Sequence, residues 1–165
     1  MQEGGRAEVA EAKRSRVLLA GAAAAVIAVD QASKAWAVAN LGGGRRIAIP
    51  GSLFNLSLVH NPGSAFGLFG ASTRLVFAAS LAILAAVTIW AVRNPEAPVR
   101  LGMVIGGGAG NLVDRIFRPP GLGAGHVVDF INFSFWPAFP TFNLADSAIV
   151  VAVTLLLAEA IKPGA

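Results

Sequence analysis

Four long apolar stretches run through this chain of 165 residues and constrain its fold more than any other feature. They cover approximately residues 17–38, 74–92, 99–117 and 144–161. A helix that rises about 1.5 Å per residue needs roughly 20 apolar residues to cross a bilayer core about 30 Å thick. Charged residues make up only 13% of the chain, too few to cover the surface of a soluble domain. The pattern predicts an all-α integral membrane protein with four transmembrane helices.

Basic residues predict the orientation of these helices. Residues 1–16 form a polar, basic tail, and Arg93 and Arg100 flank the connection between the second and third apolar stretches. Cytoplasmic segments of membrane proteins carry an excess of Lys and Arg, so we expect this tail and both termini in the cytoplasm. The expected organisation is one membrane domain over residues 17–162, with outer loops at 39–73 and 118–143.

The first outer loop contains a segment with the periodicity of a β-strand. Apolar and polar side chains alternate between residues 52 and 59, so successive side chains would point to opposite faces of a strand. Residues 45–49 precede this segment and could pair with it. We therefore expect a small extracytoplasmic β-hairpin or sheet in this loop.

The second outer loop is rich in aromatic residues. Six of the thirteen aromatic side chains in the chain lie between Phe130 and Phe142. Aromatic side chains are enriched where a membrane meets water. The sequence predicts an interfacial aromatic segment, which could also shield a nearby site from water.

All four aspartates lie inside or beside apolar segments, where an unpaired charge is costly and indicates function. Asp30 has Lys34 one helical turn later, and Asp114 is followed by Arg115, which could pair with it or with another acid nearby. Both aspartates could thus be paired, structural carboxylates. Asp129 and Asp146 have no lysine or arginine within four positions. These two are the candidates for chemistry.

Two carboxyl groups a few ångströms apart share one proton, which gives an acid and a base at the same pH. One can then activate a water molecule while the other polarises a scissile carbonyl. The alternative is that Asp129 and Asp146 are interface residues that reach water and cap helices, with Asn143 or Asp146 as the N-cap of the fourth stretch. The residues alone leave both interpretations open.

Glycines at 102, 106 and 110 recur at every fourth position of the third apolar stretch. Such a face allows two membrane helices to pack closely, and Asn111 beside it could donate a hydrogen bond to a carboxylate. The chain has no cysteine, and its two histidines do not form a ligand pair, so no metal site or cofactor is expected.

Five motifs, in order along residues 26–160, together resemble the lipoprotein signal peptidase (signal peptidase II) family of bacterial membrane aspartic peptidases. They are Asp30-Gln-Ala-Ser-Lys34, Asn61-Pro-Gly-Ser-Ala-Phe-Gly67, Gly107-Gly-Ala-Gly-Asn-Leu-Val-Asp-Arg115, Val127-Val-Asp-Phe130 and Phe142-Asn-Leu-Ala-Asp146. By this resemblance the catalytic pair falls on Asp129 and Asp146. The resemblance also implies supporting residues that line or hold the site: Asn61, Gly63, Asn111, Asp114, Arg115, Asn143 and, in the first motif, Asp30.

The resemblance implies a cytoplasmic-membrane enzyme that removes signal peptides from diacylglyceryl-modified prolipoproteins, cleaving before the lipidated cysteine. It further implies that no metal is needed and that globomycin inhibits the enzyme. One departure is the segment between Arg115 and Val127, which is longer than the usual family spacing and suggests an outer loop extended at Pro119–Gly125.

A transporter subunit and a packing subunit are the alternatives to a peptidase. A transporter or proton-pathway subunit would also place carboxylates in a membrane, but it would often show an internal repeat or paired interrupted helices, and the sequence shows neither. A packing subunit would explain the glycine face but not two unpaired aspartates.

Overall fold

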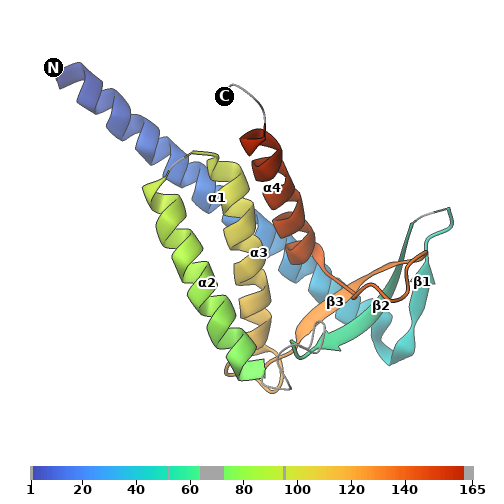
Figure 1. Cartoon of the computed structure of the whole chain (residues 1–165). Coiled ribbons are helices and arrows are strands. Elements are labelled where there is room, and N and C mark those ends of the chain that lie inside the picture. Colours follow the sequence, from blue (N-terminus) through green and yellow to red (C-terminus); the bar gives the residue numbers. More distant parts are fainter. Residues whose placement is uncertain (1, 52, 64–72, 95, 162–165) are drawn as a thin grey trace.

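The computed structural model describes residues 2–51, 53–63, 73–94 and 96–161, with side chains from residue 5 onward. The described residues form four α-helices and one three-stranded sheet (Figure 1). In chain order the elements are α1 (Gln2–Leu41), the short 3-10 helix η1 (Gly42–Gly44), β1 (Arg46–Ala48), β2 (Phe54–Asn61), α2 (Thr73–Arg93), α3 (Pro98–Phe117), β3 (Val127–Phe133) and α4 (Leu144–Ala160).

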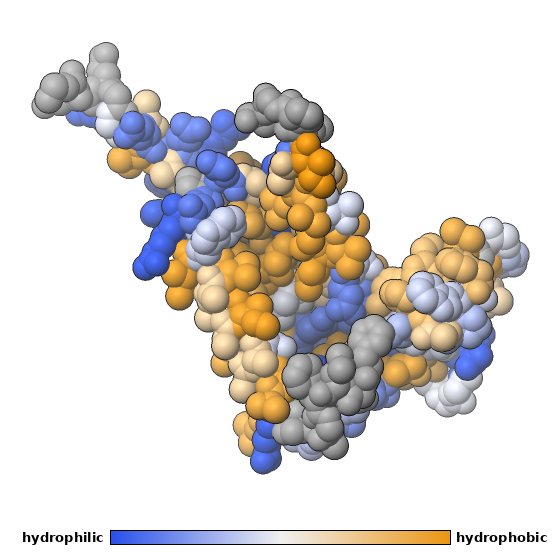
Figure 2. All heavy atoms as spheres, viewed as in Figure 1, coloured by the Kyte–Doolittle hydropathy of each residue, from blue (hydrophilic) through white to orange (hydrophobic). Residues whose placement is uncertain are grey.

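The four helices coincide with the four apolar stretches, but α1 also continues through the basic tail as far as Gln2. Among the described residues, two helical segments are long and apolar enough to cross a membrane: α1 with η1, and α2. α3 carries three charged side chains at Arg100, Asp114 and Arg115, and α4 has only 17 residues. Helix α1 begins and α4 ends at the same end of the bundle, and the sheet lies toward the other end (Figure 1). Figure 2 shows apolar residues over the visible sides of the helices.

The predicted glycine face of α3 is confirmed as a packing surface. A Cβ atom built on Gly102 would lie 2.4 Å from the carbonyl oxygen of Leu19, and one on Gly106 would lie 2.6 Å from that of Ala23. Both contacts are with α1, so the two helix backbones approach more closely than any larger residue would allow. This close packing sets the distance between α1 and α3, and both helices carry site residues.

Replacing Gly106 with alanine is therefore expected to destabilise the protein by about 1–3 kcal/mol, the usual cost of overpacking. Gly21→Ala in α1 is the matched control, because a Cβ there has nothing within 4 Å. The control should be neutral or stabilising by up to about 1 kcal/mol, because alanine favours helix. Thermal unfolding in detergent measures both. A Gly106→Ala protein that melts no lower than wild type would contradict the close packing.

The sheet has the antiparallel order β1-β2-β3. Strands β1 and β2 confirm the β element predicted in the first outer loop. Strand β3 was not predicted, since residues 118–143 were assigned to a loop. Its register places Val127 opposite Asn61 and Phe133 opposite Phe54. Its partner lies more than sixty residues earlier in the chain, and no local pattern reveals such a pairing.

The sheet packs on the C-terminal end of α1. Ala37 and Leu41 of that helix form a buried cluster with Val128 and Phe130 of β3. Beyond this cluster, the ring of Phe133 contacts four other aromatic rings at centroid distances of 5.0–5.4 Å: those of Phe54, Phe135, Phe139 and Phe142. The aromatic segment is thus a packed unit. The sheet holds Asp129 at a defined position beside the helix ends.

Candidate active site

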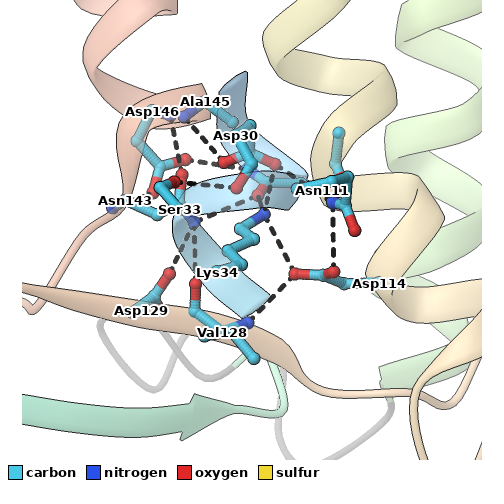
Figure 3. Close-up of polar contacts among 12 residues, drawn as sticks. Asp30, Ser33, Lys34, Asn111, Asp114, Val128, Asp129, Asn143, Ala145 and Asp146 are labelled. Atoms are coloured by element: carbon cyan, nitrogen blue, oxygen red, sulfur yellow. Dashed lines mark hydrogen bonds and ion pairs between the residues drawn. The ribbon is translucent and has the colours of Figure 1, made fainter. Parts of the chain in front are cut away.

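Asp129 lies in β3 and is only 2% exposed. Two asparagine side chains hold its carboxylate. Asn61 at the end of β2 donates from Nδ2 to Oδ2 at 2.9 Å, and Asn143 before α4 donates from Nδ2 to Oδ1 at 2.7 Å. Both carboxylate oxygens therefore have a neutral donor, and Figure 3 shows the contact with Asn143.

Asp146 lies in the first turn of α4, where it is the third helical residue (N3) of a capping box that starts at Asn143. The backbone N–H of Asn143 donates to Asp146 Oδ2 at 3.2 Å, and the backbone N–H of Asp146 donates to Asn143 Oδ1 at 2.9 Å. Asn111 on α3 donates from Nδ2 to Asp146 Oδ1 at 2.8 Å. The helix-capping interpretation is thus correct for this end of α4, with Asn143 as the N-cap.

Asn143 connects the two aspartates, since its side chain donates to Asp129 while its backbone donates to Asp146. Both aspartates line one cavity of about 270 Å³. The other predicted residues in its lining are Asn61, Gly63, Asn111 and Arg115, and the lining also includes Val76, Ser80 and Val127, which the sequence did not suggest. Within the described part of the chain, no group of three or more His, Asp or Glu side chains is arranged to hold a metal ion.

A fully buried lysine organises the layer behind this cavity. Lys34 Nζ lies 2.8 Å from Asp30 Oδ2 and 2.9 Å from Asp114 Oδ2, and it donates to Asn111 Oδ1 at 2.9 Å (Figure 3). All three charged side chains are inaccessible to solvent. The prediction that Asp30 pairs with Lys34 is confirmed. Asp30 and Asp114 thus both pair with Lys34.

The expected partner of Asp114 is different in the structure. Arg115, next to it in sequence, makes none of the ion pairs found among the described residues. Asp114 instead pairs with Lys34, and its Oδ1 accepts from Nε of Arg118 at 2.7 Å. The reason is helical geometry: consecutive residues point about 100° apart, so Asp114 faces α1 while Arg115 reaches the cavity. Residues i and i+4, such as Asp114 and Arg118, share a face.

Asn111 connects Lys34 to the cavity through hydrogen bonds. Its Oδ1 accepts hydrogen bonds from Lys34 Nζ and from Asn143 Nδ2 at 3.1 Å. The amide must then present its Nδ2 to Asp146, where it donates. A second amide, that of Gln31, braces the same layer by donating to Asp30, to Asp114 and to the Gly110 carbonyl at 3.0–3.2 Å. Gln31 was missed, although it stands inside the first motif.

Gly63 and Arg115 form another part of the cavity wall. Gly63 has a φ of +103°, and a Cβ there would lie 3.1 Å from Arg115 Nη2. Its backbone N–H donates to Asn61 Oδ1 at 2.8 Å, which leaves Nδ2 of that amide for Asp129. Arg115 is buried and donates to the Pro62 carbonyl at 3.4 Å. Glycine at 63 thus permits a turn that brings an amide and a guanidinium to the cavity.

Burial raises the pKa of Asp129 to about 6, because removal from water disfavours the carboxylate. The hydrogen bond from Asn61 opposes this rise in pKa, and the charge of Asp146 adds to it. A carboxyl group with such a pKa holds a proton at a pH where an ordinary aspartate is ionised. Near pH 6, Asp129 is therefore present in both its protonated and its ionised form.

This shift predicts how stability depends on pH. A raised pKa means that protonated Asp129 favours the folded state; this contribution is present below pH 4 and is lost as the pH rises through about 6. Asp129→Asn lacks the titrating group. We expect the variant's melting temperature, relative to wild type, to increase between pH 4 and pH 6 and then level off. A difference that is constant over this range would contradict the assigned pKa.

The family model described as signal peptidase (SPase) II matches residues 22–162. The chain is 42% identical over 144 residues to the lipoprotein signal peptidase of Rhodococcus jostii, covering 86% of this chain and 71% of that protein. It is 41% identical over 143 residues to that of Leifsonia xyli, covering 86% of this chain and 65% of the relative.

A solved bacterial membrane enzyme has a similar fold, with a TM-score of 0.72 and 26% identity over 86% of this chain and 91% of that one. The residues matched by the family model include all five motifs, and the fold agrees over most of the chain. On this evidence, the chain belongs to the signal peptidase II family of aspartic peptidases.

Proposed function

We propose that this enzyme removes signal peptides from diacylglyceryl-modified prolipoproteins by cleaving before the lipidated cysteine, with Asp129 and Asp146 as its catalytic pair. Membership of the lipoprotein signal peptidase family supports cleavage of lipoprotein signal peptides. The observation that carries the catalytic assignment is the shared cavity, where one residue, Asn143, holds both carboxylates. Neither carboxylate has a salt-bridge partner among the described residues, whereas Asp30 and Asp114 are both paired with Lys34.

The proposed reaction needs one proton on the pair. The ionised carboxylate removes a proton from a water molecule as the water oxygen attacks the scissile carbonyl carbon. The protonated partner donates a hydrogen bond to the carbonyl oxygen and stabilises the developing negative charge. Collapse of the tetrahedral intermediate breaks the C–N bond, and the pair returns a proton to the departing amine of the lipidated cysteine. No covalent enzyme intermediate forms.

The supporting residues serve this proposal by orienting the carboxylates. Asn61 and Asn143 direct Asp129, and Asn111 directs Asp146. Lys34 acts through Asn111, and Asp30 and Asp114 hold Lys34; none of the three is in the described lining of the cavity. Arg115 lines the cavity, and in this proposal its guanidinium donates to the substrate backbone.

The proposed membrane arrangement has all four helices crossing the bacterial cytoplasmic membrane. Both termini and the basic tail of residues 1–16 lie in the cytoplasm, and residues 17–162 form one membrane peptidase domain. The candidate pair lies at the end of the bundle where the sheet packs, away from the start of α1 and the end of α4 (Figure 1). The active site would thus open near the outer face. The substrate's acyl chains would remain in lipid, and globomycin would compete for the cavity.

Cleavage by the purified protein tests this function. A diacylglyceryl-modified prolipoprotein should gain mobility on gel electrophoresis, and mass analysis of the product should place its new N-terminus at the lipidated cysteine. The same precursor without lipid is the matched control and should remain intact. If a reference lipoprotein signal peptidase cleaves the lipidated precursor and this protein does not, the proposed substrate is wrong.

A further inference from the structure

A second cavity, here called the sheet cavity, lies on the β-sheet. Its volume is about 280 Å³, and its lining comes from all three strands and the aromatic segment after β3. Among the described residues, it shares no lining residue with the active-site cavity. The residues that matter for binding are Arg46, Asn55, Ser57, Asn132, Ser134 and Trp136.

Hydrogen bonds within the sheet cavity leave an excess of donors. Asn132 Nδ2 donates to Ser57 Oγ at 2.9 Å, and Asn55 Nδ2 donates to Ser134 Oγ at 3.4 Å. Each serine oxygen thus accepts a hydrogen bond, which leaves its own O–H to donate. Asn132 Oδ1 is occupied as well, because Thr141 donates to it at 2.6 Å. The cavity therefore suits a group that offers several acceptor oxygens.

Arg46 gives the sheet cavity its charge. It lies on the exposed edge strand β1, opposite Ser57, and forms no salt bridge within the described ranges. The described lining contains no aspartate or glutamate that would neutralise it. A guanidinium presents five N–H donors in a planar fork that matches phosphate oxygens. The expected ligand group is therefore an anion such as a phosphate.

The surroundings of the sheet cavity favour a lipid as the source of this phosphate. Trp136, in the lining, is 53% exposed, and the neighbouring Phe135 and Leu53 are 64% and 62% exposed. Apolar and aromatic side chains beside an unpaired cation are typical of the membrane–water interface, where headgroup phosphates lie. In Figure 2 this part of the molecule carries hydrophobic and hydrophilic residues side by side.

We infer that the sheet cavity binds the phosphate group of an anionic phospholipid. Arg46 pairs with the phosphate oxygens, the hydroxyls of Ser57 and Ser134 donate to the same headgroup, and Trp136 contacts its glycerol unit. The bound lipid anchors the sheet to the bilayer surface beside the active site. The inference rests on the proposed placement of the sheet at the outer membrane surface, and it requires nothing of Asp129 or Asp146.

Binding of dihexanoyl phosphatidylglycerol, kept below its micellar concentration, tests the inference with the full chain in a nonionic detergent. Isothermal titration calorimetry compares wild type with Arg46→Gln and with Arg45→Gln, the control that removes an adjacent, exposed arginine outside the cavity lining. Loss of the charged contact in Arg46→Gln should weaken binding about tenfold, which corresponds to ~1.4 kcal/mol. Ser57→Ala, which keeps the charge, should weaken it about threefold, and Arg45→Gln should bind like wild type.

Equal losses in the Arg45 and Arg46 variants would overturn the inference, because they would indicate general surface charge. Inorganic phosphate, titrated in parallel, must bind far more weakly than the lipid; equal binding with the same dependence on Arg46 would indicate a free-anion site. A higher KM for the prolipoprotein in Arg46→Gln, with lipid binding unchanged, would assign the cavity to substrate instead. Cleavage in detergent should otherwise be unaffected by Arg46→Gln, so the lipid site can fail while the proposed peptidase function stands.

Discussion

Replacing either Asp129 or Asp146 with asparagine is expected to reduce cleavage of a lipidated prolipoprotein by at least about a thousandfold. Removal of one acid–base group usually costs about 10²–10⁴ in rate, and loss of either member leaves the pair unable to supply both an acid and a base. Asparagine has nearly the shape of aspartate and retains an oxygen that can accept from Asn61 or Asn111. Its Nδ2 replaces the other oxygen, so each variant also loses one accepted hydrogen bond, and this effect on stability has to be measured apart from the effect on the reaction.

Single-turnover cleavage and thermal unfolding, measured on the same preparations, separate these two effects. Glu159→Gln is the matched control, because it makes the same change of carboxylate to amide at the other end of α4, in an exposed pair with Arg100. That control should cleave like wild type. If either aspartate variant keeps near-normal activity while folded, the catalytic assignment fails, and Asp114 or Asp30 becomes the replacement candidate.

Replacing Lys34 with methionine is expected to cause the largest loss of stability. Lys34 is fully buried between Asp30 and Asp114, so its removal leaves two carboxylates without their shared cation. Breaking a buried ion pair from one side typically costs about 3–5 kcal/mol. The substitution also removes one of the two donors to Asn111 Oδ1, so that only Asn143 Nδ2 still holds the amide next to Asp146.

Chemical or thermal unfolding in detergent measures the effect, with Arg100→Met as the control. Arg100 pairs with Glu159 in a partly exposed position, where a salt bridge is worth about 1 kcal/mol or less. Adding Asp30→Asn to Lys34→Met should recover part of the stability, because one uncompensated buried charge is then removed. A Lys34→Met protein as stable as the Arg100→Met protein would show that the buried cluster does not hold the helices together.

The features that could be predicted from the sequence are those with short-range causes. The apolar stretches gave the four helices, because helical hydrogen bonds and burial of apolar side chains both act within one segment. The glycine repeat identified the packing face of α3, and the four-residue spacing of Asp30 and Lys34 identified their salt bridge. The apolar settings of Asp129 and Asp146 selected the two carboxylates that line the cavity and form none of the salt bridges found in the described part of the chain.

The features that could not be predicted depend on contacts distant in sequence. Lys34 reaches Asn111 across 77 positions, and no local pattern shows that one lysine serves both Asp30 and Asp114. Strand β3 forms only because β2 offers it an edge, so its apolar residues fit a loop or a strand equally well when read alone. Of the two alternatives for Arg115, a pair with the adjacent Asp114 is not formed, because consecutive residues on a helix point in different directions.

Asn143 holds both the beginning of α4 and the candidate catalytic pair in position. It caps the helix, accepts the backbone N–H of Asp146 and holds Asp129 with its side-chain amide, and it is fully buried. In a genetic screen, loss-of-function variants at this position would therefore combine poor membrane accumulation with low specific activity. Their phenotypes could be mistaken for simple misfolding. For the same reason, few substitutions at Asn143 could stabilise the protein. A change that improved the N-cap of α4 would also displace the candidate pair.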